Sequence, residues 1–188
     1  GQNGLGISLW LLGSRNGDIE LLKDAIAAYR SALEERRREH EPLDWAQTWN
    51  DLGNTLTTLG QQESGTKRLE EAVQAYETAL LERTITAKPL DWAQTMNNLG
   101  VVLWQLGQRE SEKKHLEEAI TALKASFEVY TRERTPFDWS QSQNNLGLVL
   151  WTLGNREASS ERLTRAGAID PSARHQATAW RTARPKAL

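Results

Sequence analysis

Two kinds of side chain that could bind a ligand recur along this chain at a fixed interval. Asparagine recurs at one position of a 47-residue interval and tryptophan at another; we call such a position a register. The residues are Asn3, Asn50, Asn97 and Asn144, and Trp10, Trp104 and Trp151. A carboxamide both donates and accepts hydrogen bonds, which matches the backbone of an extended peptide. An exposed indole in a groove commonly anchors a side chain of a partner. The pattern therefore predicts noncovalent recognition.

Residues suited to covalent or metal chemistry show no such pattern. The three histidines fall at unrelated registers, and none has a second histidine at metal-ligand spacing. The chain has no cysteine, which excludes disulfides and thiolate catalysis. It has neither a phosphate-binding glycine loop nor a Gly-x-Ser-x-Gly motif. We therefore expect no catalytic residue, no metal site and no cofactor in this segment, while a longer parent protein could carry an enzymatic domain elsewhere.

Composition narrows the class of partner. The chain has 188 residues, of which 38% are hydrophobic and 26% charged, with a formal net charge of -2. That charge argues against a nucleic-acid clamp, and no apolar run approaches the roughly 20 residues that cross a bilayer. We expect a protein or peptide partner, no nucleic acid and no membrane. The lack of a signal peptide and of cysteine favours a cytoplasmic location, and the start at Gly1 instead of Met indicates a segment of a longer protein.

The interval of 47 residues is an internal repeat that extends over most of the chain. The string Pro-Leu-Asp-Trp ends at Trp45 and again at Trp92, and Pro-Phe-Asp-Trp ends at Trp139. The same interval separates four Leu-Gly pairs, which end at Gly6, Gly53, Gly100 and Gly147. Residues 1–170 therefore divide into four units, at about 1–43, 44–90, 91–137 and 138–170.

The pattern within each unit predicts two helices. In the second unit, Asp44 and Gln47 form a capping box that starts a first helix, and Gly60 ends it. A second helix is predicted from about Thr66 to Thr84. Its apolar residues share one face, at Leu69, Val73, Tyr76 and Leu80. Tandem helix pairs bury their apolar faces only by stacking on their neighbours, which predicts an elongated solenoid.

These residues resemble the tetratricopeptide repeat. The resemblance rests on aromatic, Leu-Gly and small residues at fixed places of the second unit: Trp49, Leu52, Gly53, Leu56, Gly60, Ala72, Tyr76 and Ala79. The usual unit has about 34 residues, and the longer unit here is similar to the repeats of kinesin light chains and of bacterial sensor and scaffold proteins. The resemblance implies an all-α fold, a right-handed α-α solenoid of helical hairpins, with a concave groove that binds peptides or protein segments.

One stripe of each first helix would face that groove. It supplies the candidate binding residues Gln47, Asn50, Asn54, Gln94, Asn97, Trp104, Gln141, Asn144 and Trp151. Two structural alternatives stay open. The asparagines could form a ladder of hydrogen bonds to the neighbouring helix, and the tryptophans could pack beneath the long turn within each unit. The adjacent Arg109 and Glu110 predict a local ion pair.

The segment after the repeats differs in charge. Residues 171–188 contain Arg174, Arg181, Arg184 and Lys186 and no acidic residue. We expect a helix from Pro171 to about Ala183 that caps the solenoid; a functional basic tail and a disordered tail are the alternatives. Exposed solenoid ends also favour a self-associating scaffold, the alternative to a peptide-binding module. The resemblance alone suggests a regulatory or sensor arm of a larger protein.

Overall fold

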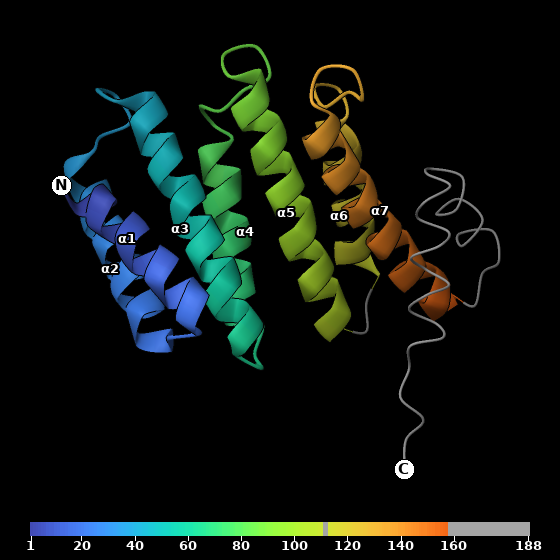
Figure 1. Ribbon diagram of the computed structural model, residues 1–188, viewed down its shortest axis with the longest axis horizontal. Helices are drawn as coiled ribbons and strands as arrows, with labels where there is room; N and C mark the ends of the chain where they lie inside the picture. The colour runs from blue at the N-terminus through green and yellow to red at the C-terminus, as the bar shows by residue number, and fades with distance from the viewer. Residues whose placement is uncertain (111–112, 158–188) are drawn as a thin grey trace.

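The chain folds as a stack of α-helical hairpins. The computed structural model describes residues 1–110 and 113–157, and every regular element in that part of the chain is an α-helix. The helices are α1 (Gln2–Asn16), α2 (Ile19–Glu35), α3 (Pro42–Gln62), α4 (Lys67–Ala79), α5 (Pro89–Arg109), α6 (Lys114–Ser126) and α7 (Pro136–Glu157). They follow one another along the stack in chain order (Figure 1). The predicted all-α repeat fold is confirmed.

The helices form two layers. The first helices of the units, α1, α3, α5 and α7, lie in one layer, and α2, α4 and α6 lie behind them (Figure 1). The backbones of neighbouring first helices come into contact at a few points, whereas those of α2 and α4, and of α4 and α6, do not. Because the first helices are closer together, their free surface forms the inner side of a curved stack. We call this surface the inner face, and the surface formed by the second helices the outer face.

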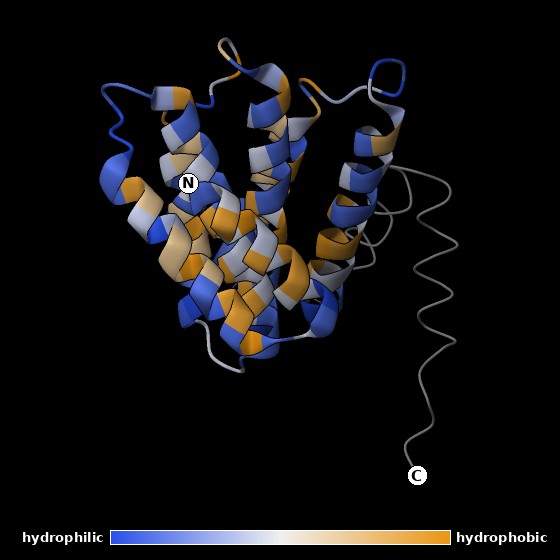
Figure 2. Cartoon of the chain, turned by 60° about the vertical axis from the view of Figure 1, so that its left-hand side comes forward, coloured by the Kyte–Doolittle hydropathy of each residue, from blue (hydrophilic) through white to orange (hydrophobic). Residues whose placement is uncertain are grey.

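The hydrophobic core lies between the two layers. Leu52 and Leu56 of α3 and Leu69 and Tyr76 of α4 are each at most 2% exposed. A Cβ at Gly53 would lie 2.7 Å from the Tyr76 ring, so only glycine lets the two helices approach this closely. Figure 2 shows hydrophobic residues gathered where the helices face one another and hydrophilic residues along most of the connecting loops.

The ends of the first helices differ from those predicted. Helix α3 begins at Pro42 with Glu41 as its N-cap residue and has no side-chain cap hydrogen bond, so the predicted capping box was wrong. Asp44 lies in the first turn, where a carboxylate complements the helix dipole. The helix continues beyond Gly60, where a Cβ would lie 2.6 Å from Leu69 Cδ2. Gly60 therefore allows α3 and α4 to pack closely, and it does not end α3.

Two of the second helices, α4 and α6, are shorter than predicted. Helix α4 ends at Ala79 and α6 at Ser126, so the predicted end near Thr84 was wrong. The chain turns after Ala79, with the Arg83 N–H donating to the Ala79 carbonyl at 3.0 Å. The helix predicted from Pro171 to Ala183 and the second helix of the fourth unit lie outside the described residues.

Candidate functional site

The predicted binding residues differ in exposure. Gln94, Gln141 and Asn144 are exposed, and Gln47, Asn54, Trp104 and Trp151 are half-buried. Asn50 and Asn97, by contrast, are 2% and 7% exposed. All nine residues lie on α3, α5 and α7. The first layer therefore carries both surface amides, which can meet a ligand, and buried amides, which meet other parts of the protein.

Asn50 and Asn97 join neighbouring first helices. The Thr95 hydroxyl lies 3.1 Å from Asn50 Oδ1, and the Ser142 hydroxyl donates to Asn97 Oδ1 at 3.0 Å. Asn145 Nδ2 donates to the same Asn97 oxygen at 3.1 Å. These bonds link α3 to α5 and α5 to α7, so the buried asparagines form the inter-helix ladder that was one of the two alternatives. A ligand-holding role for them stays a prediction.

Asn54 also contributes to packing between units. Its Oδ1 accepts a hydrogen bond from the Tyr76 hydroxyl at 2.8 Å and from Asn98 Nδ2 at 3.0 Å. The Tyr76 hydroxyl is in addition 3.3 Å from the Thr57 hydroxyl. One amide oxygen thus connects the first helix of its unit, the second helix of its unit and the next first helix.

The indole N–H groups of Trp10 and Trp104 donate hydrogen bonds to the next unit. Trp10 Nε1 donates to the Thr58 hydroxyl at 3.3 Å, and Trp104 Nε1 donates to the Thr152 hydroxyl at 2.9 Å. Each acceptor lies 48 residues after its donor, on the next first helix. Trp104 therefore has its N–H engaged within the protein, and its half-buried ring is the part that remains for a partner.

A buried arginine organises polar groups beneath the inner face, and the sequence analysis missed it. Arg83 is 2% exposed. Its guanidinium donates to the Thr95 hydroxyl at 2.8 Å, to the Asp91 carbonyl at 3.3 Å and to Gln47 Oε1. Arg36, 47 residues earlier, makes the equivalent bond to Thr48 at 2.9 Å. That recurrence of arginine at one register was the available signal.

Gln47 connects the hydrogen bonds of Arg83 to the carboxylate of Asp51. Its Nε2 donates to Asp51 Oδ1 at 2.8 Å. Burial raises the pKa of Asp51, and the hydrogen bond from Gln47 and the charge of Arg83 counteract part of that rise. Burial also lowers the pKa of Arg83, against the opposing charges of Asp91 and Asp51. The arrangement is a buried hydrogen-bond network in which the charges of Arg83 and Asp51 only partly offset the cost of their burial.

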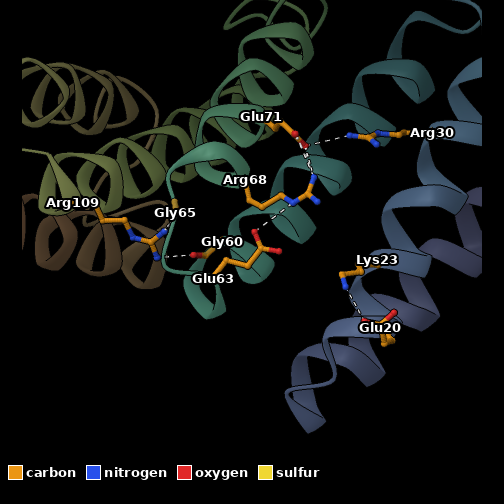
Figure 3. A network of polar contacts seen from close by, with 9 residues as sticks. All are labelled: Glu20, Lys23, Arg30, Gly60, Glu63, Gly65, Arg68, Glu71 and Arg109. Carbon is orange, nitrogen blue, oxygen red and sulfur yellow. Dashed lines mark hydrogen bonds and ion pairs between the residues drawn. The ribbon is translucent and has the colours of Figure 1, made fainter.

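Arg109 closes the end of the preceding first helix. It donates to the carbonyl of Gly60 at 2.6 Å and to the carbonyl of Gly65, both in the preceding unit (Figure 3). Arg156 donates in the same way to the carbonyl of Gly107. The predicted local pair of Arg109 with Glu110 was wrong, because a helix end offers carbonyl groups that need donors.

A second concave feature lies on the opposite side of the molecule, between α4 and α6. This hollow of about 700 Å³ is lined by Val73, Glu77, Met96, Leu99, Leu103, Lys114, His115, Glu117, Glu118, Thr121 and Ala122. We call it the outer hollow, since α4 and α6 are its walls and α5 its floor. The sequence analysis missed it because its lining residues are individually unremarkable at their positions in the repeat.

Within 1–110 and 113–157, no three metal-ligating side chains come together. No helix in the same two ranges has both the length and the apolar character of a membrane span.

The comparisons with known proteins agree with this architecture. Residues 92–128 match the family model of the tetratricopeptide repeat. No curated protein matches the chain. Similar solved structures include one described as "DHF58 filament", with 15% sequence identity and a TM-score of 0.47 over 96% of this chain and 94% of that one. The matched segment covers most of α5 and α6, and the interval of 47 residues extends its pattern to the other units. The described part of the chain is therefore an all-α repeat fold, and its residues 92–128 are similar to the tetratricopeptide repeat.

Proposed function

We propose that the chain is a protein-interaction module whose inner face binds an extended peptide or a segment of a partner protein. Tetratricopeptide repeats are typically non-catalytic interaction modules, and the repeat match supports that class. The observation that carries the proposal is the row of exposed amides on two successive first helices, α5 and α7. Gln94 and Gln141 share one register, and Asn144 stands at the register whose earlier members, Asn50 and Asn97, are buried. Such groups can pair with the backbone of an extended ligand without selecting its side chains.

The indoles and the buried amides have separate roles in this proposal. Trp104 and Trp151 flank the amide row with half-buried rings, which offer apolar contact area at low conformational cost. Asn50 and Asn97 hold α3, α5 and α7 in register through their bonds to Thr95 and Ser142. Through these bonds they position the exposed amides.

The test uses peptides that bind the unaltered chain, selected from a displayed library of random short sequences. A variant with Gln94→Ala, Gln141→Ala and Asn144→Ala should bind the selected peptides at least about tenfold more weakly, with an unchanged helical circular dichroism spectrum. Gln74→Ala removes an exposed amide from α4 on the outer face and serves as the matched control. Equal binding by the triple variant and the control would reject the inner-face proposal.

A self-associating scaffold is a second candidate, favoured by the free surface of α1. Leu5 and Leu12 are 50% and 52% exposed, whereas their counterparts Leu52 and Leu59 are 2% and 0% exposed. These two α1 side chains are left to solvent, so a second copy could cover them. Light scattering over a concentration series tests this candidate, with Leu5→Glu and Leu12→Glu as the disrupting changes. A strictly monomeric unaltered chain would eliminate it.

A further inference from the structure

The two crevices between neighbouring second helices differ, although the repeat makes them equivalent. Between α2 and α4, Arg30 and Arg68 both pair with Glu71, with N–O distances of 3.2 and 3.1 Å. Arg68 also lies 3.6 Å from Glu63 (Figure 3). Arg30 therefore reaches across this crevice from α2 and supplies a cation to the carboxylate of α4.

Between α4 and α6 the same registers carry different charges. Glu77, His115 and Glu118 stand at the registers of Arg30, Arg68 and Glu71, respectively. His115 Nδ1 lies 2.5 Å from Glu110 Oε2, and its Nε2 lies 3.9 Å from Glu118 Oε2. The cation that crosses the first crevice is thus replaced by a carboxylate. Within the described part of the chain, Glu77 makes no ion pair and no side-chain hydrogen bond.

The second crevice also contains less side-chain volume. Met96 and Val73 stand at the registers of Trp49 and Ile26, and each is smaller than its counterpart. The outer hollow of about 700 Å³ lies at this place, with Val73, Met96, Leu99, Leu103 and Ala122 as its apolar lining. Ligand sites commonly enclose about 300–1,000 Å³. The replacements therefore leave a space of useful size with an apolar floor.

We propose that the outer hollow binds a partner segment that presents an arginine flanked by aliphatic residues. The guanidinium occupies the place that Arg30 takes in the preceding crevice and pairs with Glu77 and Glu118. Its planar donors match carboxylates in a bidentate manner. Its methylene stem and the flanking aliphatic side chains cover Met96 and Leu103 on the floor.

Charge complementarity favours this basic occupant over an acidic one. The lining contains the carboxylates of Glu77, Glu117 and Glu118, the ammonium group of Lys114 and the imidazole of His115, which lies against Glu110 and Glu118. Lys114 Nζ lies 3.8 Å from Glu118 Oε1, and the two side chains are 71% and 44% exposed. This pair is long and lies within one helix, so Lys114 does not cross the hollow to α4 as Arg30 crosses the preceding crevice, and Glu77 is left for a cation from a partner. The site is on the outer face and shares no residue with the predicted inner-face site.

The test measures fluorescence anisotropy of a fluorescein-labelled peptide of alternating leucine and arginine. The comparison peptide has citrulline in place of each arginine, which removes the charge and keeps the shape. The arginine peptide should bind the full chain at least about tenfold more tightly than the citrulline peptide. The variant with Gln94→Ala, Gln141→Ala and Asn144→Ala should bind it as the unaltered chain does, so failure of the inner-face proposal is measured separately.

Two variants of the hollow give the decisive result. Glu77→Arg rebuilds the pair seen between Arg30 and Glu71, and Met96→Trp restores the bulk of Trp49. Each should weaken binding of the arginine peptide at least about tenfold while the helical spectrum is kept. Glu20→Arg is the control, because it changes the net charge as Glu77→Arg does but at a side chain that is 78% exposed. Its affinity for the arginine peptide should stay within about twofold of that of the unaltered chain.

The proposal is overturned by any of three results. The first is that the unaltered chain binds the arginine and citrulline peptides equally. The second is that Glu77→Arg and Met96→Trp both fold and still bind the arginine peptide as the unaltered chain does. The third is that Glu20→Arg loses as much affinity as Glu77→Arg. The last result would mean that the peptide responds to net charge alone.

Discussion

The amide oxygen of Asn97 lies 3.0 Å from the hydroxyl of Ser142, 45 residues later and one unit further along the stack. Asn97 is 7% exposed and Ser142 is 0% exposed. Asn97→Ala would leave Ser142 and Asn145 without this acceptor. We expect the free energy of unfolding to fall by about 1–3 kcal/mol, measured by urea denaturation.

Asn144→Ala is the control for this change, because Asn144 occupies the same register but is exposed. Its effect on the free energy of unfolding should stay within about 0.5 kcal/mol. Equal losses in the two variants would contradict the ladder as the reason for the buried asparagine.

Arg83→Ala should destabilise the chain more than a surface arginine change does. It removes the donors to Thr95 and Gln47 from a site that is 2% exposed, and we expect a loss of about 2–4 kcal/mol. Arg30→Ala, whose side chain is 57% exposed, should cost at most about 1 kcal/mol. Chemical denaturation of both variants checks the difference, and similar losses would show that the buried network contributes little.

Asp51→Asn should stabilise the chain at neutral pH. Later units already have asparagine at this register, and there Asn145 Nδ2 donates to Asn97 Oδ1. The equivalent acceptor for residue 51 is Asn3 Oδ1, which is buried and lacks a hydrogen-bond partner within the described residues. The new amide supplies that donor, and we expect a gain of about 1 kcal/mol in the free energy of unfolding.

The pH dependence of this gain follows from the raised pKa of Asp51. The folded state disfavours the charged carboxylate, so it binds more protons than the unfolded state between the two pKa values. The unaltered chain therefore loses stability as pH rises from about 4, the ordinary value, through the higher folded-state pKa. The advantage of Asp51→Asn should be largest above that window and should narrow in acid. Urea unfolding over a pH series measures it, and an advantage that grows in acid would contradict this sign.

Gly53→Ala should damage packing without changing the backbone conformation. The new Cβ would lie 2.7 Å from the Tyr76 ring, which must move within a filled core, and we expect a loss of about 1–3 kcal/mol. At Gly65 a Cβ meets nothing within 4 Å, so Gly65→Ala should have a much smaller effect. Thermal unfolding of both variants distinguishes a packing requirement from a general cost of replacing glycine.

The sequence predicted the helical repeat because its signals are local and periodic. The stripe of Leu69, Val73 and Tyr76 identifies one helix face whatever the neighbours are. Helix ends were harder to place, because Asp44 suits the first turn as well as the N-cap position. The recurrent asparagines were recognised as important, but an amide that faces a ligand and one that faces a neighbouring helix have the same sequence pattern.

The remaining features depend on contacts between units. Arg83 acts through Gln47, which lies 36 residues earlier on another helix, and no spacing rule connects them. The outer hollow results from differences between repeats, such as Met96 in place of Trp49. A pattern shared by all repeats does not reveal the positions at which one repeat differs from the others. Aligning the units and asking where size or charge changes would have pointed to Glu77 and Met96.

Neighbouring first helices are tied directly to one another, whereas α4 and α6 are connected through α5. Hydrogen bonds from Asn50 and Asn97 fix the spacing of the first helices, whereas no backbone contact joins α4 to α6. A segment inserted between α4 and α6 would splay the outer edges and tighten the bend of the opposite side. Occupancy of one side would then alter ligand affinity on the other through bending alone.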